Sequence, residues 1–417
     1  MPASTAPTRP PLKLKQKYLF IHQNFPGQFV HLATELVRLG HEVVALGIQG
    51  RTLPGVKFLR YAPKAPARTS EVEAAIDFET KVVRGTACAQ VMVKLKADGF
   101  TPDVIVAHPG WGESLFCKDV WPSVRLVMFA EFFYGTDGTD YHFDPEFTAD
   151  TVAARMRLRI KNSVHLHALH AADVVYAPTH WQANQIPAEY RSKVQVIFDG
   201  IDTTVVKPNA KASIHLQREN LKLDAHSEVI TFVNRNLEPY RGFHIFMRAL
   251  PEILKARTNA HVLIIGRDEV SYGSAPKAGG TWREVMLTEV GGQLPMARVH
   301  FLGGLPYDDY LRVMQISSCH VYLTYPFVLS WSCVEAMSTG RVVVSSRTGP
   351  VTEVIEHGKN GLLFDFFDVA ALSKQVIAVL NQPEAFAALG VQARKTVVER
   401  YDLKTRCLPQ LLKLLKH

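Results

Sequence analysis

Between Tyr325 and Thr352 the sequence combines a carboxylate with a strand-to-helix connection that suits an anion. The apolar run 320–323 predicts a strand, and a helix is expected over 332–338 after a short polar and aromatic loop. Unpaired N–H groups and the positive end of the helix dipole can hold a diphosphate at such a connection. We expect Glu335 in the first turn of this helix, where it can accept hydrogen bonds from a vicinal diol such as that of a ribose. The stretch therefore predicts a nucleotide-sugar site at the carboxyl end of a parallel sheet.

Ser332 and Glu335 also have the spacing of a capping box, in which both side chains only satisfy amides at the start of a helix. The local pattern by itself favours this structural interpretation. A further strand is predicted over 341–345, and the turn 347–350 after it is expected to open another helix beside the same site. The rest of the chain shifts the balance towards a binding site.

Two arginines follow the strand that is predicted over 229–233. Arg235 comes directly after this strand, and Arg241 precedes Gly242 at the start of the next predicted helix. Together they can clamp a diphosphate leaving group and stabilise its charge in the transition state. The alternative is that both are solvated loop arginines, the commoner fate of any single arginine.

Another candidate group follows the strand that is predicted over 103–107. His108, Trp111 and Glu113 lie in the Gly-containing stretch after it, where α/β proteins place ligand contacts. The alternative is a histidine that only caps the strand. The stretch 131–135 offers a similar but weaker pattern after the next strand.

Gly27 and Gln28 lie in the turn after the first predicted strand, where a glycine lets a phosphate or sugar approach the backbone. Ordinary turn chemistry explains a lone glycine equally well, and without a Gly-x-Gly-x-x-Gly fingerprint a dinucleotide site has little support. The sequence also lacks a Walker loop, a Gly-x-Ser-x-Gly elbow, a zincin helix and the protein-kinase motifs. His165, His167 and His170 share one predicted helix without the partners of a metal frame, so we expect surface or interdomain histidines and no metal site.

Length and composition describe an ordinary globular protein, since 417 residues suffice for two domains and 47% of them are hydrophobic. No segment approaches the roughly 20 apolar residues that span a bilayer. Residues 1–16 lack the apolar core of a secretory signal and are expected to be a disordered lead-in. Five dispersed cysteines predict a reducing compartment without a disulfide framework or a zinc site. The net charge of +8 suits anionic nucleotide, lipid phosphate or a membrane surface, but no stripe of the nucleic-acid-binding type is present.

Short apolar strands separated by helices predict an α/β fold with parallel, doubly wound sheets that are covered on both faces. The alternation breaks over the polar stretch 199–227, which suits an interdomain connection, and then resumes. We therefore expect one Rossmann-like domain over 17–205, a second over 206–385, and helices over 386–417 that pack back towards the first. Two such domains in succession predict a ligand cleft between them that closes by hinge motion. The stretch 267–281, rich in Gly, Ser and Pro, is expected to be a loop.

The order of the motifs resembles the retaining GT-B glycosyltransferases of family 4 (group 1) over nearly the whole chain, from about Lys17 onward. Each motif is weak alone, but their order and spacing together are specific. The motifs that carry the resemblance are Pro26-Gly27, Gly40-His41-Glu42-Val43, Val106-Ala107-His108, Ala177-Pro178-Thr179, Ile197-Phe198-Asp199-Gly200-Ile201-Asp202, Arg235, Arg241-Gly242, Phe301-Leu302-Gly303, Val334-Glu335-Ala336-Met337 and Gly361-Leu362-Leu363.

The resemblance implies an acceptor-side first domain, a second domain that binds the nucleotide sugar, and a helical C-terminal tail. It implies a hexosyltransferase that moves a sugar from a UDP- or GDP-sugar donor to a glycan or lipid-linked acceptor with retention, as in cell-surface polysaccharide synthesis. Such enzymes need no metal or other cofactor for the transfer. We accordingly expect a cytoplasmic protein that can contact the inner face of the membrane peripherally and has no nucleic-acid partner.

The resemblance also implies roles for individual residues. Glu335 corresponds to the second acid of a paired-glutamate motif and is expected on the ribose of the donor. Arg235 and Arg241 correspond to the basic pair that neutralises the departing diphosphate. His108 corresponds to a histidine of the acceptor domain near the transferred sugar. The remaining donor-binding positions are Gly27, Gln28, Gly303, Gly304 and Leu305, the last three in the turn beside the base.

One departure from the family pattern concerns the first acid of that motif, whose position is held by Phe327. The carboxylate that normally holds the hydroxyls of the donor sugar is therefore missing. Backbone amides or serine hydroxyls of the following loop are expected to replace it. A milder change is arginine at position 241, where lysine is commoner. The replacement candidates are Val328, Leu329, Ser330, Trp331 and Ser332.

Three alternatives to a transferase remain open on the sequence. Phe327 is compatible with a non-catalytic GT-B protein that only binds a nucleotide or sugar, although the retained Arg235, Arg241 and Glu335 argue against lost catalysis. A GT-B phosphorylase or epimerase would share the fold, but no extra phosphate pocket is recognisable in the sequence. A nicotinamide oxidoreductase is disfavoured by the missing fingerprint.

Overall fold

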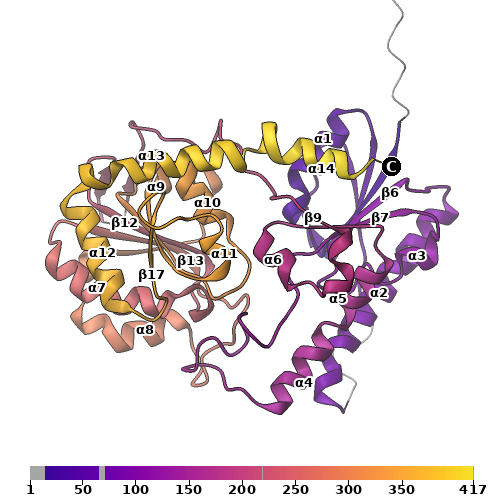
Figure 1. Ribbon diagram of the computed structural model, residues 1–417, viewed down its shortest axis with the longest axis horizontal. Helices are drawn as coiled ribbons and strands as arrows, with labels where there is room; N and C mark the ends of the chain where they lie inside the picture. The colour runs from indigo at the N-terminus through magenta and orange to yellow at the C-terminus, as the bar shows by residue number, and fades with distance from the viewer. Residues whose placement is uncertain (1–14, 65–70, 218, 417) are drawn as a thin grey trace, which may run out of the picture. The chain divides into compact units, whose positions relative to one another are not determined.

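The computed structural model describes residues 15–64, 71–217 and 219–416, which form two compact units (Figure 1). The first unit holds the described residues up to Ala130, the stretch Ile160–Tyr176 and the described residues from Leu414 onward. The second unit holds Glu131–Arg159 and Ala177–Lys413. Most of the lead-in that was expected over 1–16 lies outside the described residues. Within them, no helix is both long enough and apolar enough to cross a bilayer.

The first unit is built on parallel strands in the order β5-β3-β1-β6-β7-β8. The strand order reverses direction at the β1–β6 pair, so the loops after these two strands lie at a topological switch point, where open α/β sheets bind ligands. The strand bounds are β1 Lys17–Ile21, β3 Glu42–Gly47, β5 Val56–Arg60, β6 Val104–Ala107, β7 Arg125–Phe129 and β8 Val174–Ala177.

Helices of this unit connect consecutive strands, as a parallel sheet requires. The longest, α2, runs over Glu73–Ala97 and precedes β6. Two dipeptide strands, β2 Asn24–Phe25 and β4 Gln49–Gly50, form a separate parallel pair. The other helices are η1 Gly27–Phe29, α1 Val30–Arg38, α3 Cys117–Val120 and α5 Ser163–Ala171, while α4 Val152–Lys161 spans the division between the units.

The second unit repeats the same order with β14-β13-β12-β15-β16-β17, again all parallel. Its switch point lies at β12 and β15, the two strands that precede the predicted arginines and the predicted diphosphate loop. The strand bounds are β12 Val229–Asn236, β13 His261–Arg267, β14 Val299–Gly303, β15 Cys319–Tyr322, β16 Val342–Ser346 and β17 Leu362–Phe364.

Alternate residues of these strands pack into two separate cores, one on each face of the sheet. In β12, Ile230 and Phe232 join the core that contains α7, α8 and α12, whereas Val229 and Val233 join the core that contains α9, α10 and α13. Both faces are therefore apolar, which is why the strands read as continuous hydrophobic runs. The helix bounds are α6 His180–Gln185, α7 Phe243–Ala256, α8 Trp282–Val290, α9 Tyr307–Ile316, α10 Trp331–Ser338, α11 Gly349–Thr352, α12 Val369–Asn381, α13 Pro383–Arg400 and α14 Leu408–Leu414.

The predicted alternation of strands and helices is confirmed, with three differences. The helix that was predicted to carry His165, His167 and His170 is α5, and a break at Asn162 separates it from α4. The supposed connection 199–227 contains an antiparallel hairpin, whose alternating leucines and Ile214 pack against the second unit. The strands β5 and β17 and the helix α8 were not predicted. The hairpin strands are β10 Ser213–Leu216 and β11 Leu221–Asp224, and the short β9 spans Val194–Val196.

The loop that was expected over 267–281 is confirmed, since no helix or strand lies between β13 and α8. All five cysteines are buried and free, so the prediction of no disulfide framework is also confirmed.

Candidate functional site

The loop between β15 and α10 carries the predicted diphosphate site, and its details differ from the sequence-based expectation. The helix begins at Trp331, and Ser330 is its N-cap, with Oγ accepting from the amide of Ser332 at 3.4 Å. The capping box predicted between Ser332 and Glu335 is therefore absent. Glu335 is the fifth helical residue, so its expected place in the first turn was also wrong. The helix starts one residue before the expected position 332, and two residues before the start that a capping box at Ser332 requires.

Glu335 is buried and held by two tyrosines of α9. The hydroxyls of Tyr307 and Tyr310 each donate to one of its carboxylate oxygens at 2.6 Å. Burial raises the pKa of Glu335 above its usual value, and the two hydrogen bonds oppose this rise. Because each carboxylate oxygen has a second lone pair, the group can still accept hydrogen bonds from a diol. The tyrosines fix the direction in which it does so.

Arg241, which ends the short η3 helix Pro239–Arg241, is almost fully buried at 5% exposure. Its Nη1 donates to the hydroxyl of Thr324 at 2.7 Å and to the carbonyl oxygen of Val328 at 2.8 Å. Its guanidinium also lies over the rings of Tyr272 and Phe327, at 5.0 and 5.7 Å. Within the described part of the chain no carboxylate lies at ion-pairing distance from it.

A buried, permanently charged group without a protein counterion is unusual, because burial of an unpaired charge is costly. The interpretation of Arg241 as a solvated loop residue was therefore wrong. Arg235 differs: it is exposed near the end of β12 and makes no hydrogen bond or ion pair with another described residue. The predicted arginine pair thus consists of one buried and one exposed member.

Phe327, at the position where the family pattern has an acid, lies in an aromatic cluster. Its ring contacts those of Phe132, Tyr240 and Tyr272 at centroid distances of 4.6, 5.1 and 5.1 Å. The hydroxyl of Tyr240 is hydrogen-bonded to Asp140. Aromatic rings thus occupy the neighbourhood of Arg241 where a carboxylate would otherwise stand.

The loop 328–332 supplies a second set of predicted donor contacts, and most of its polar groups have partners within the protein. The amide of Ser330 donates to the hydroxyl of Tyr322 at 2.8 Å, and the two serine hydroxyls lie 3.0 Å apart. Leu329 is buried in the core below α10. The expectation that the Ser330 amide is open to a ligand was therefore wrong.

Trp331 fixes a buried acid beneath this loop. Its Nε1 donates to Oδ2 of Asp199 at 2.8 Å. Burial raises the pKa of Asp199 to about 7, a rise that the Trp331 hydrogen bond opposes and the nearby Glu131 increases. Asp199 thus titrates close to neutral pH.

The residues that were predicted beside the base, Gly303 to Leu305, lie at the end of β14 and in the turn after it. They belong to the second unit, as do Glu335 and the two arginines. Gly303 has φ +64°, a conformation that favours glycine, and nothing would contact a Cβ at this position. A Cβ at Gly304 would come within 3.0 Å of Nε of Arg267. Leu305 packs partly buried against the core of this unit.

In the first unit His108 is buried at the carboxyl end of β6, among aromatic rings. Its imidazole stacks on Trp111 at 4.3 Å, and the ring of His22 lies edge-on at 5.3 Å. The amide of Gly110 donates to Nδ1 of His108 at 3.1 Å, which leaves the Nε2 side of a neutral imidazole as the donor. The ring therefore orders its loop, as the capping interpretation holds.

Gly27 and Gln28 surround His22 and belong to this unit, apart from the other predicted donor residues. A Cβ on Gly27 would lie 2.4 Å from Nε2 of His22, and φ at this residue is +48°. Because the amide of Asn24 donates to Nδ1 of His22, its Nε2 carries the proton and donates to Oε1 of Gln28 at 2.9 Å. The close approach that the glycine permits is thus to a histidine ring.

Glu113 is fully buried, with Oε1 accepting from the hydroxyl of Tyr61. Burial raises its pKa. His165 is buried as well, which excludes the surface position, one of the two that were expected, and burial lowers its pKa well below 6.5. His167 and His170 are exposed, as expected.

Several residues around these groups were missed by sequence reasoning. His22 directly follows β1, and its position at a strand end was a usable signal. Tyr307, Tyr310 and Asp199 had no local signal, because each is brought to the site by an element distant in sequence.

Comparison with known proteins identifies the family. Residues 39–206 match the family described as "Glycosyl transferase family 4 group", and residues 213–396 match "Glycosyl transferases group 1". The two matches are consecutive and together span most of the chain.

Curated relatives share modest identity. A D-inositol 3-phosphate glycosyltransferase of Corynebacterium efficiens is 25% identical over 227 residues, covering 53% of this chain and 51% of the relative. The D-rhamnosyltransferase WbpZ of Pseudomonas aeruginosa is 25% identical over 278 residues, covering 66% of this chain and 65% of the relative. The chain thus spans about half to two thirds of the length of these relatives.

Solved structures share the fold over nearly the whole chain. A sucrose-phosphate synthase from Thermosynechococcus elongatus superposes with a TM-score of 0.71 at 16% identity, covering 96% of this chain and 98% of the other. Anabaena Alr3699/HepE, solved with UDP and glucose, gives a TM-score of 0.66 at 17% identity, covering 96% and 99%. The chain therefore belongs to the group 1 glycosyltransferases and has the GT-B fold of two Rossmann-like domains with a helical C-terminal region.

Proposed function

We propose that this protein transfers a sugar from a UDP- or GDP-sugar to a glycan or glycolipid acceptor with retention of anomeric configuration. The observation that carries the proposal is the buried guanidinium of Arg241, which has no carboxylate partner among the described residues. A diphosphate supplies the missing negative charge. Arg235, exposed at the end of the neighbouring strand β12, adds a second positive charge that the diphosphate can reach.

The ribose is assigned to Glu335, whose two oxygens are oriented by Tyr307 and Tyr310. A fixed acceptor suits the 2′,3′-diol because both hydroxyls must donate at once. The turn Gly303–Leu305 is assigned to the base. These assignments follow the family resemblance, and the grouping of the residues in one unit supports them.

In the proposed reaction the acceptor hydroxyl attacks the anomeric carbon on the face from which the diphosphate departs. The carbon–oxygen bond to the β-phosphate breaks as the new glycosidic bond forms, and a β-phosphate oxygen takes the hydroxyl proton. Arg241 and Arg235 stabilise the charge that develops on the diphosphate. Positioning and charge stabilisation suffice, so we propose that the transfer step itself uses no metal ion or cofactor.

The acceptor is assigned to the first unit, where the rings of His22, His108 and Trp111 pack together after strands β1 and β6. Sites for small polar ligands commonly combine apolar walls with a few placed polar groups. We assign His108 to the transferred sugar, as the family resemblance implies. The names of the relatives, a D-inositol 3-phosphate glycosyltransferase and a D-rhamnosyltransferase, support glycosyl transfer, and the glycan or glycolipid acceptor follows the family resemblance. We also propose that the protein contacts the inner face of the membrane peripherally and acts in cell-surface polysaccharide synthesis.

The decisive experiment is thermal-shift binding of nucleoside diphosphates and nucleotide sugars to the wild type, Arg241→Lys and Glu335→Ala. A ligand at about 100 times its Kd stabilises the native state by about 2.7 kcal/mol, which is readily visible as a raised Tm. We expect a shift with one base, reduced in both variants. The exposed Arg312→Lys, paired only with Asp309, is the matched control for the arginine change.

Absence of any shift in the folded wild type would overturn the nucleotide-sugar site. Binding without transfer to any glycan or lipid-linked acceptor would instead favour the non-catalytic binder. Release of a sugar 1-phosphate from a glycan in the presence of phosphate would favour a phosphorylase, and interconversion of the nucleotide sugar itself an epimerase.

A further inference from the structure

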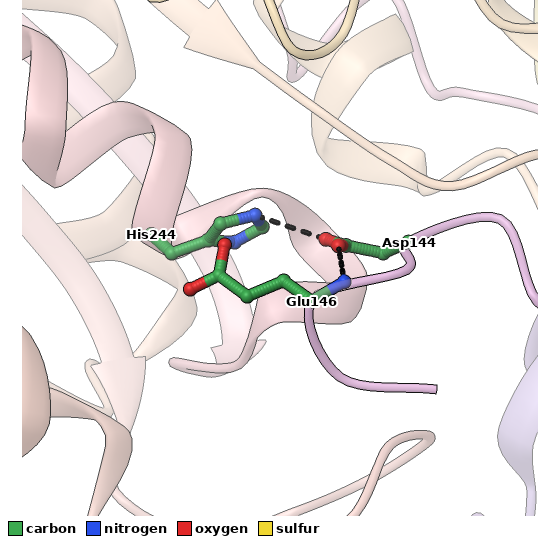
Figure 2. A group of neighbouring side chains, drawn as sticks. All are labelled: Asp144, Glu146 and His244. Carbon is green, nitrogen blue, oxygen red and sulfur yellow. Dashed lines mark hydrogen bonds and ion pairs between the residues drawn. The ribbon is translucent and has the colours of Figure 1, made fainter. Parts of the chain in front are cut away.

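Outside the groups assigned to the donor, the second unit contains a cluster of three side chains with metal-ligand chemistry. Asp144 and Glu146 come from the segment before α4, and His244 comes from the first turn of α7 (Figure 2). One oxygen of each carboxylate and one nitrogen of the imidazole all lie within 4.8 Å of one another. Figure 2 shows the two acidic side chains on either side of the imidazole's outer edge.

His244 is the most unusual member, because it is 1% exposed and neither of its ring nitrogens has a hydrogen-bond partner in the described structure. Its Nε2 points towards Asp144 and lies 3.1 Å from Oδ2, but without the alignment of a hydrogen bond. Two ligands on one tetrahedral ion are separated by about 3.3 Å when each bond is about 2.0–2.1 Å long. The pair therefore has the spacing of two ligands that share an ion.

Asp144 is fixed in its orientation by the protein. Its Oδ1 accepts from the amide of Glu146 at 3.0 Å, and its Oδ2 accepts from the hydroxyl of Tyr325 at 2.8 Å. Ligand carboxylates are characteristically held by such hydrogen bonds from their surroundings. Rings of Phe147 and Phe366 pack against His244 and complete an apolar wall.

The charges around the cluster leave an excess of negative charge. Arg248 donates to both oxygens of Glu146, at 2.8 and 2.7 Å, and it also pairs with Glu289. The positive charge of Arg248 is thus divided between two carboxylates, while Asp144 has no arginine or lysine partner among the described residues. A divalent cation balances this charge.

We propose that Asp144, Glu146 and His244 bind one divalent transition-metal ion, with Zn²⁺ as the reference ion. An imidazole nitrogen with two carboxylate oxygens is a ligand set for zinc and its neighbours, and less suited to Mg²⁺ or Ca²⁺, which prefer oxygen alone. Glu146 is 44% exposed, so its side chain can turn one oxygen to the ion, and water completes the coordination from that side. The ion is structural: it ties the segment 144–146 to α7 and, through Tyr325, to the loop before α10.

The test uses the full-length protein stripped of metal by chelation and titrated with Zn²⁺ by calorimetry, and with Co²⁺ by visible absorption. We expect saturable one-to-one Zn²⁺ binding and Co²⁺ bands of four- or five-coordinate nitrogen and oxygen ligation. His244→Gln and Glu146→Gln should each weaken binding by at least about tenfold. The partly exposed Glu146→Gln tests the site even where the buried His244→Gln fails to fold.

Two control variants separate this site from other ion binding. Glu289→Gln removes the other acid on Arg248 without removing a ligand, and it should bind Zn²⁺ as the wild type does. His261→Gln removes one member of a separate histidine pair, His261 and His300, whose ring nitrogens lie 3.1 Å apart, and it should also bind Zn²⁺ normally. A metal-stripped wild type that shows no saturable binding would overturn the proposal. Binding that is lost in His261→Gln but kept in Glu146→Gln would overturn it as well. Neither outcome depends on the donor site, since no nucleotide is present.

Discussion

Each unit buries a glutamate that accepts hydrogen bonds from tyrosine, but the two glutamates differ in how many of their carboxylate oxygens have a partner. In the second unit both oxygens of Glu335 accept hydrogen bonds, from Tyr307 and Tyr310. In the first unit only Oε1 of Glu113 has a partner, Tyr61, while its buried Oε2 has none among the described residues. Burial raises the pKa of both carboxyl groups.

The number of hydrogen-bond donors decides whether the carboxylate or the protonated carboxyl group is favoured at each glutamate. Two neutral donors compensate much of the cost of a buried carboxylate, so Glu335 remains an oriented acceptor. A bare buried oxygen favours the protonated form, which suits Glu113 to a structural role between β6 and α3. The second unit also buries the unpaired cation of Arg241, and the first contains no comparable group among its described residues. The comparison supports the proposal that the second unit recognises the diphosphate and the diol.

The largest expected effect comes from removing the buried cation. Arg241→Ala should lower kcat/KM for the nucleotide sugar by about 10²–10³-fold, the usual cost of losing one group that stabilises developing charge. Arg241→Lys should recover part of this loss, because it restores the charge without the stacked planar group. Steady-state kinetics with far-UV circular dichroism as a folding control provides the measurement. Wild-type kinetics in a folded Arg241→Ala would contradict the central role of this residue.

A third buried acid, Asp199, extends the comparison because it has a single donor, Trp331. Its folded pKa of about 7 exceeds the usual 3.8, so the folded state holds the proton more tightly than the unfolded state. Its contribution to stability is therefore full below about pH 4 and is lost as pH rises towards about 7. The difference corresponds to an upper limit of about 4 kcal/mol.

Asp199→Asn removes this titration and keeps an acceptor for Trp331. We expect the variant and wild type to have similar stability at pH 4 and the variant to become progressively more stable towards pH 8. Urea unfolding at several pH values measures the difference. A difference that does not change with pH would show that Asp199 is not titrating in this range.

Exchanging each buried glutamate for glutamine tests directly whether the two carboxylates have different roles. Glu335→Gln should weaken nucleoside diphosphate binding by about tenfold, or about 1.4 kcal/mol, because the amide nitrogen cannot accept from the diol. Glu113→Gln should leave this affinity unchanged. Calorimetry with the nucleoside diphosphate and its 2′-deoxy analogue gives a sharper test, since only the wild type and Glu113→Gln should discriminate between them. Equal discrimination in Glu335→Gln would remove the ribose assignment.

The smallest effect is expected for the exposed cation. Arg235→Ala should weaken diphosphate binding only a few-fold, and the loss should shrink as salt is raised, because exposed charges are screened. The affinity of wild type and variant at low and high ionic strength measures this. A loss as large as that of Arg241→Ala, and insensitive to salt, would mean that Arg235 is buried against the ligand.

Much of the architecture was predictable because it depends on local patterns. Continuous apolar runs such as those of β12 and β15 reflect sheets covered on both faces, and the segments after such strands then gave Arg241, Glu335 and His108 as candidates for ligand contacts. The hairpin β10–β11 was missed although its apolar residues alternate. The sequence on either side of it is polar, and in the chain it stands between β9 and β12, where a connection was expected. The start of α10 was misplaced by one residue, which was enough to change the interpretation of Ser332.

The sequence by itself determined the fold class, the order of the elements and the residue types that stand at the strand ends. Only the tertiary structure decided which of these residues are buried and what they touch. Sequence spacing could not distinguish Arg241 from Arg235, since burial depends on Thr324, Phe327 and the loop that covers them. Nor could it join Glu335 to α9 or His244 to Asp144, because packing of elements distant in the chain makes these contacts. Local chemistry selects the candidates, and long-range packing sets their charge, orientation and access.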